Sequence, residues 1–117
     1  MGNLSKHFNR DEFACKCGKC KAIAVDKELV DALEDIRTHF GKPLIITSSY
    51  RCEEHNRNVG GSANSMHLTG KAADIQVLGA EPSKVQGYVL NKYPEQYGIG
   101  SYATFTHIDV RDTKARW

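Results

Sequence analysis

The chain has 117 residues, of which 40% are hydrophobic and 26% are charged, with a formal net charge of +2 and a mean hydropathy of -0.50. This length predicts a single domain over residues 1–117 with a modest core, and no apolar run approaches the roughly 18 residues of a membrane-spanning helix. The net charge is too small to indicate a nucleic acid partner, and no membrane partner is expected either.

The N-terminal residues lack the apolar segment of a secretion signal, so the sequence predicts a protein made in the cytoplasm. Residues 4–13 show no helix or strand period. We expect a short irregular segment that Phe8 and Phe13 anchor to the core.

Three of the four cysteines are clustered and one is distant: Cys15, Cys17, Cys20 and Cys52. Without a secretion signal, this pattern does not indicate a disulfide framework. Four thiolates bind zinc tetrahedrally, and the spacing from Cys17 to Cys20 is usual for chelation, so a structural zinc site is one hypothesis. The alternative is a set of reduced thiols, or one disulfide that ties this segment to the region of Cys52.

Residues 26–40 are predicted to form a helix. Asp26 is a good N-cap, apolar residues recur at spacings of four, three and four, and Gly41 follows as a stop signal. Residues 44–48 form a continuous apolar, β-branched run, which predicts a buried strand. The polar residues 53–61 predict a loop that follows a short turn of helix.

The segment 65–74 carries donor groups for a metal ion. His67 offers an imidazole and Asp74 a carboxylate, which suit a divalent metal, and zinc best of all when a second histidine completes the set. His107 is the candidate for that second histidine. Two histidines and one aspartate leave the fourth tetrahedral position for water, which is the arrangement of a catalytic zinc site.

Four further elements are predicted around these donors. Residues 72–77 form a strand, a helix starts at Pro82 and ends before Pro94, and residues 99–103 and 105–110 form two antiparallel strands.

In the last of these strands, alternation places His107, Asp109 and Arg111 on the face of the site and the aliphatic residues between them on the core face. Arg111 is expected to pair with a carboxylate such as Asp109 or Asp112. The basic tail, residues 114–117, is expected to extend into solvent.

Several motifs occur together along the chain: Ser49-Tyr50-Arg51, Glu54-His55-Asn56, Val59-Gly60-Gly61, Ser65-x-His67-x-x-Gly70-x-Ala72-x-Asp74 and His107-Ile-Asp109-Val-Arg111. In this combination the chain resembles the zinc D-Ala-D-Ala carboxypeptidase family of metallopeptidases. That family includes phage endolysins and is related in fold to the hedgehog amino-terminal domain. The resemblance runs from about Asn9 to Arg111 and is greatest to the small single-domain form often found in phage. It implies an α+β fold, in which a small antiparallel sheet carries helices on one face.

The resemblance also implies roles for particular residues. The zinc ligands would be His67, Asp74 and His107. Ser65 would fix the motif loop or orient a ligand, and Arg51 would bind the carboxylate or carbonyl of the substrate. A guanidinium is always charged and binds a carboxylate through two parallel hydrogen bonds, which suits a peptide that ends in D-alanine. The alternative for Arg51 is a salt bridge to one of the two nearby glutamates.

One departure from the family pattern concerns the general base. Family members carry an acidic residue a few positions before the last histidine ligand, whereas residues 103–106 here contain none. Asp109 is the nearest carboxylate, and it could act as the base or accept a hydrogen bond that fixes an imidazole tautomer. Further candidates for proton transfer or oxyanion stabilisation are Tyr102, Glu53 and His55.

The expected function is that of a zinc-dependent peptidase which hydrolyses peptidoglycan stem peptides. It would be a DD- or LD-carboxypeptidase or an endopeptidase, expected to act as a monomer on the cell wall during phage lysis. The alternatives are a catalytically weak or silent zinc-containing module that binds the cell wall, and a virion structural component.

Overall fold

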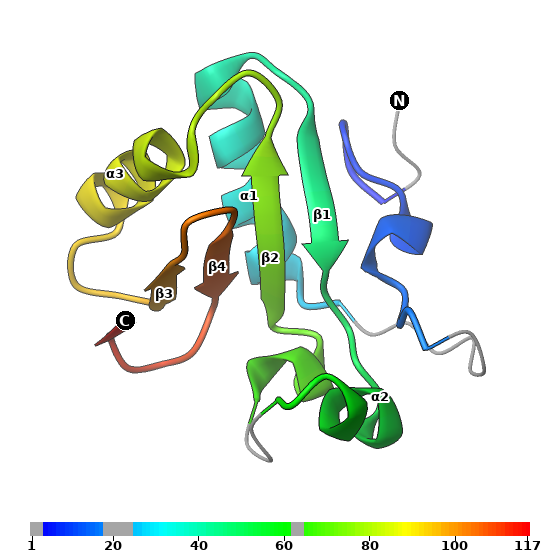
Figure 1. Ribbon diagram of the computed structural model, residues 1–117. Coiled ribbons are helices and arrows are strands. Elements are labelled where there is room, and N and C mark those ends of the chain that lie inside the picture. The colour runs from blue at the N-terminus through cyan, green and yellow to red at the C-terminus, as the bar shows by residue number, and fades with distance from the viewer. Residues whose placement is uncertain (1–3, 18–24, 62–64) are drawn as a thin grey trace.

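One sheet of five strands organises the part of the chain that the structure, a computed structural model, describes: residues 4–17, 25–61 and 65–117. The strands are β1 (Leu44–Ser48), β2 (Ala72–Val77), β3 (Gly98–Ser101), β4 (Thr106–Asp109) and β5 (Ala115–Arg116). Their order is β1-β2-β4-β3-β5, and every neighbouring pair is antiparallel except β3 with β5 (Figure 1).

Three α-helices and two short 3-10 helices complete this described part: η1 (Arg10–Phe13), α1 (Lys27–Phe40), α2 (Glu53–Asn58), η2 (Met66–Thr69) and α3 (Pro82–Lys92). Both ends of α1 are capped by the residues that the sequence predicts. The Asp26 carboxylate accepts a hydrogen bond from the Glu28 backbone N–H at 2.8 Å, and Gly41 ends the helix in the left-handed region at φ 62. Pro82 begins α3. Proline has no backbone N–H, and this costs no hydrogen bond here because the first N–H groups of a helix have no intrahelical partner.

The core lies between the sheet and two of these helices. In Figure 1, α1 lies behind the sheet and α3 beside β3. Fully buried side chains from both helices meet side chains from three strands: Leu29, Leu33 and Ile36 from α1, Val85 and Val89 from α3, and Ile75, Ile99 and Ile108 from the sheet. The predicted α+β class is therefore confirmed.

The N-terminal segment packs onto this core as expected. Phe8 and Phe13 are only 1% and 0% exposed, and their rings meet edge to face. The backbone N–H of His7 donates to the Glu34 carboxylate on α1 at 2.7 Å, which fixes the start of the segment.

The prediction that residues 44–48 form a fully buried strand is only half right. Leu44 and Ile46 are buried, but Ile45 is 45% exposed. β1 is an edge strand, and Ile45 pairs with Gln76 on the face opposite the core. A continuous apolar run cannot show on which side a strand is covered.

The prediction that residues 114–117 extend into solvent is wrong. Ala115 and Arg116 form β5, and the Ser101 backbone N–H donates to the Trp117 carbonyl at 2.8 Å. The Arg116 guanidinium also donates to the backbone carbonyl of Tyr97 at 2.7 Å. The free edge of β3 supplies backbone partners, and a two-residue strand is too short to show a sequence period.

Three tyrosines link the helices through carboxylates, and they predict a fall in stability at high pH. The hydroxyls of Tyr88 and Tyr93 donate to Asp35, and that of Tyr97 donates to Glu28. Burial, followed by the adjacent carboxylate, raises the pKa of Tyr88 and of Tyr97 to about 12, and the same causes raise the pKa of Tyr93.

Because these pKa values are higher in the folded state, their contribution to stability is complete below pH 10 and should be lost as the pH rises toward 12. Denaturant unfolding measured at several pH values from 9 to about 12 should show this fall in the free energy of unfolding. The Asp35→Asn variant should lose less stability over the same range, because two rings no longer face a charge. An equal fall in both proteins would contradict the assignment.

In the described ranges, no helix is both long and apolar enough to span a bilayer.

Candidate metal centre and its cleft

Two histidines and one aspartate converge at one point on the sheet. Ligand atoms of His67, Asp74 and His107 all lie within 4.8 Å of one another. Asp74 Oδ1 is 2.9 Å from His107 Nδ1 and 3.4 Å from His67 Nε2. The sheet register sets this arrangement, because Asp74 on β2 pairs directly with His107 on β4. The structure therefore brings the three predicted ligands together.

His67 is held with one ring nitrogen toward the other two donors. It lies on η2, where the Ser65 hydroxyl accepts from its backbone N–H at 3.2 Å and Gly70 ends the turn at φ 73. Its Nδ1 is 2.6 Å from the Ser49 carbonyl, so Nδ1 carries the proton and donates. The lone pair of Nε2 is left facing Asp74, as a metal ligand requires. Ser65 thus caps the turn that carries His67.

His107 is oriented from its other side by a buried ion pair. Its Nε2 is 2.7 Å from Oδ2 of Asp109, which is 0% exposed. The guanidinium of Arg111 contacts both oxygens of the same carboxylate at 2.7 Å. With the Nε2 proton donated to Asp109, Nδ1 of His107 is the ring nitrogen left for a metal ion, and it is directed at Asp74. The prediction that Arg111 pairs with Asp109 is met.

The electrostatics of the cluster favour a cation. Burial alone would raise the pKa of Asp74, but hydrogen bonds from His107 and His67, formed when these imidazoles carry a proton toward the carboxylate, outweigh burial and lower the pKa to about 2. A metal ion would take the place of those protons. Burial opposes a charge on His107, whereas Asp109 and Asp74 raise its pKa. Asp74 is therefore ionised at neutral pH, as a metal ligand must be. A divalent ion fits this donor set.

Arg51 lies beside the cluster, and its guanidinium is directed at Asp74 and Ser48. Its guanidinium is 3.4 Å from Asp74 Oδ2 and 3.2 Å from the Ser48 hydroxyl. Its backbone N–H donates to the His67 carbonyl at 3.0 Å, which couples the two segments. The side chain is 15% exposed, so a permanent cation opens onto the cleft next to the donors.

An open cleft of about 560 Å³ lies over these groups. Its described lining contains the cluster, Arg51, the Gly60–Gly61 loop and three aromatic residues: Tyr102, Phe105 and Trp117. Asp74 is the only carboxylate among the described residues that line it. Glu53 and His55, suggested from the sequence for proton transfer, are not among those lining residues, whereas Tyr102 is.

The aromatic wall of this cleft was not predicted from the sequence. The Trp117 ring centroid lies 5.0 Å from that of His107, and its Nε1 donates to the Tyr102 hydroxyl at 2.8 Å. Tyr102 in turn stacks on Phe105 at 4.3 Å. The C-terminal residue therefore covers one ligand of the candidate site and is not a free tail.

Two glycines on β3, Gly98 and Gly100, leave space for the side chains around His107. They are the feature of the sequence that could have indicated this close packing. Gly98 pairs with Asp109, and a Cβ there would lie 2.5 Å from that carboxylate. Gly100 pairs with His107, and a Cβ there would lie 2.6 Å from Trp117 Nε1. Alternate glycines in a strand indicate that another group approaches closely.

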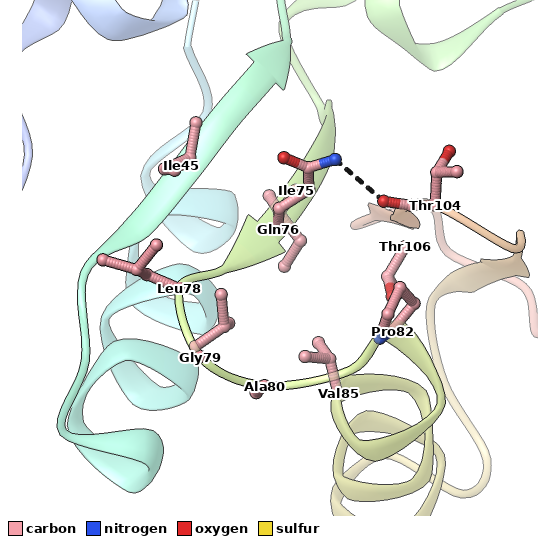
Figure 2. Close-up of a pocket in the computed structure, with 11 residues that line it drawn as sticks. Ile45, Ile75, Gln76, Leu78, Gly79, Ala80, Pro82, Val85, Thr104 and Thr106 are labelled. Carbon is pink, nitrogen blue, oxygen red and sulfur yellow. Dashed lines mark hydrogen bonds between the residues drawn. The ribbon is translucent and has the colours of Figure 1, made fainter.

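A second hollow, of about 250 Å³, lies elsewhere on the molecule between β2 and the start of α3. Figure 2 shows its mainly apolar lining, with the Gln76 amide donating to the Thr104 carbonyl at 2.8 Å. None of the described residues that line it is ionisable. This hollow therefore lacks the groups for acid–base or metal chemistry, and the cleft over His67 is the candidate site.

A buried His-Asp-His set at the floor of an open cleft, on a small α+β domain, places the chain in the class of domains that carry the donor set of a divalent-metal site. A family model described as Peptidase M15 matches residues 6–109, and the chain belongs to this family of metallopeptidases. The match confirms the resemblance to zinc D-Ala-D-Ala carboxypeptidases, and peptidases of this family use zinc. None of the curated proteins compared with the chain matches it.

Proposed function

We propose that the chain is a zinc-dependent peptidase that hydrolyses amide bonds in peptidoglycan stem peptides, as a DD- or LD-carboxypeptidase or as an endopeptidase. The observation that supports this is the convergence of His67, Asp74 and His107 beneath a cleft that also exposes a fixed cation. Zinc bound there would supply Lewis-acid activation of a water molecule and of the scissile carbonyl.

The other proposed contributions come from side chains of the chain itself. Arg51 would bind the terminal carboxylate of a stem peptide, or the oxyanion that develops at the scissile carbonyl. Its Nε donates to the Ser48 hydroxyl, and the guanidinium lies in the lining of the cleft, where an anionic peptide could reach it. The aromatic wall formed by Tyr102, Phe105 and Trp117 would pack against the apolar parts of the same peptide.

Asp109 is proposed as a positioning residue. Its carboxylate is fully buried, and both of its oxygens accept hydrogen bonds from His107 or Arg111. It therefore has no face toward the cleft from which to take a proton from water. Its proposed role is to hold His107 in the tautomer that presents Nδ1.

The same observation favours one alternative function. With Asp109 engaged and Asp74 assigned to the metal, the described lining of the cleft offers no further carboxylate as general base. The alternative is therefore a zinc-containing module that binds the cell wall but hydrolyses it weakly or not at all.

The setting we propose is lysis of a phage-infected cell, with the chain acting as a monomer on the wall. Its support is the resemblance to the small single-domain form often found in phage, and the fact that all the proposed site residues come from one chain.

Purified peptidoglycan incubated with the protein tests the proposed function. We expect new free amines or released D-alanine, a loss of that product with a chelator, and its return when zinc is added. Binding of the protein to sedimented peptidoglycan without any product, in the presence of zinc, would contradict the peptidase and favour the binding module.

A further inference from the structure

We propose that Cys15, Cys17 and Cys52 bind a second zinc ion, apart from the cleft, which clamps the N-terminal segment onto the turn that carries Arg51. The three sulfur atoms lie within 4.8 Å of one another. None of these cysteines lines the cleft, so this site is independent of the proposed function.

The sulfur spacing fits two ligands of one zinc ion. Cys15 Sγ and Cys52 Sγ are 3.7 Å apart. Two ligands at the usual Zn–S distance of about 2.3 Å from a tetrahedral zinc ion lie about 3.8 Å from each other. A disulfide would instead need a separation of about 2.05 Å. The separation therefore fits two zinc ligands, and two thiols joined by a hydrogen bond have the same separation.

Backbone N–H groups support the sulfurs. The Cys52 N–H points at Cys15 Sγ at 3.4 Å, and the His55 N–H points at Cys52 Sγ at 3.5 Å. Neutral thiols are weak acceptors, whereas a thiolate bound to a metal keeps negative charge that such donors offset. Cys15 is 8% exposed, so its sulfur is already withdrawn from solvent. The cluster thus has the surroundings of a ligand set.

The ion would join two parts of the chain that are distant in sequence. Cys15 and Cys52 are 37 positions apart in sequence, and Tyr50 N–H donates to the Phe13 carbonyl at 3.1 Å close by. Figure 1 shows the N-terminal segment running beside β1 toward the loop before α2. That loop contains Arg51, and it follows Ser49, whose carbonyl fixes His67. The clamp would therefore steady the loop that carries Arg51 at one side of the cleft.

Zinc binding at this site replaces the thiol protons, which are released to solvent, and requires no oxidant. Cys20, the fourth cysteine suggested from the sequence, lies outside the described residues, and the proposal rests on the other three.

Metal content of the full-length protein and of two variants tests the proposal. We expect two zinc ions per wild-type chain, and one in each of Cys52→Ser and His67→Ala. After replacement of zinc by cobalt, a thiolate-to-metal charge-transfer band should be present in wild type and in His67→Ala, and should be absent from Cys52→Ser. A missing band in both wild type and His67→Ala would overturn the thiolate site, whatever the activity on peptidoglycan.

A measurement on proteins with intact cysteines covers the case in which Cys52→Ser does not fold. Thiol reagents should react slowly with the wild-type protein and quickly after a chelator is added. In His67→Ala, where the cleft ion is absent, the chelator should also lower the thermal unfolding midpoint by at least about 5 °C. Immediate reaction without a chelator would overturn the proposal in favour of free thiols. Reaction only after a reductant would overturn it in favour of a disulfide.

Discussion

Replacing His67 by alanine should abolish zinc binding in the cleft and lower the rate of peptidoglycan hydrolysis by at least about 1,000-fold. Loss of a residue that hydrogen-bonds to a metal ligand lowers metal affinity or activity by about 10–100-fold. Loss of one of three ligands should lower the rate further. His67 is 3% exposed, and its Nε2 is one of the three donor atoms that the described residues bring together at the site. The remaining Asp74 and His107 would form a two-donor site, which is too weak to retain the ion against a mild chelator.

The measurement combines metal content, hydrolysis rate and circular dichroism of the purified variant. His39→Ala is the matched control, because His39 is an exposed histidine on α1 that is not one of the three donors. Its ring stacks on Tyr88. That control should keep both the cleft zinc and the rate. A folded His67→Ala protein that retains the cleft zinc and the wild-type rate would refute the ligand assignment.

Local sequence signals were sufficient for most of the elements and for the convergence of the donors. Asp26 and Gly41 fix the ends of α1 through backbone chemistry that depends on few neighbours. Side-chain alternation on β2 and β4 places Asp74 and His107 on one face, and antiparallel pairing then brings them together.

Features that depend on contacts across the sheet could not be predicted in the same way. The period of a strand shows that His107 and Asp109 share a face. It does not show that the Asp109 carboxylate contacts Nε2 of His107 while Nδ1 of the same ring points at Asp74. Trp117 is brought to His107 only because β5 pairs with the free edge of β3. The exposure of Ile45 likewise follows from a contact across the sheet, because Ile45 pairs with Gln76 on the face opposite the core.

Replacing Asp109 by asparagine should weaken zinc binding in the cleft by about 10–100-fold, the usual effect of losing the carboxylate partner of a histidine ligand. The amide keeps the size of the side chain but removes the charge that holds the proton on His107 Nε2 and pairs with Arg111. His107 would then present Nδ1 to the metal for a smaller fraction of the time. At limiting zinc the rate should fall in proportion to occupancy.

The zinc dependence of the rate separates this positioning role from proton transfer. If Asp109 only orients His107, saturating zinc should restore Asp109→Asn to within about tenfold of the wild-type rate. If Asp109 were the general base, the fully loaded variant would remain slower by about 10²–10⁴-fold, since no ion can replace a lost proton acceptor. Asp112→Asn, at an exposed carboxylate three residues further on, is the control for charge and should leave both zinc affinity and rate unchanged. The burial of Asp109 and its two hydrogen-bonded oxygens favour the first outcome, because a group without access to water cannot take a proton from it.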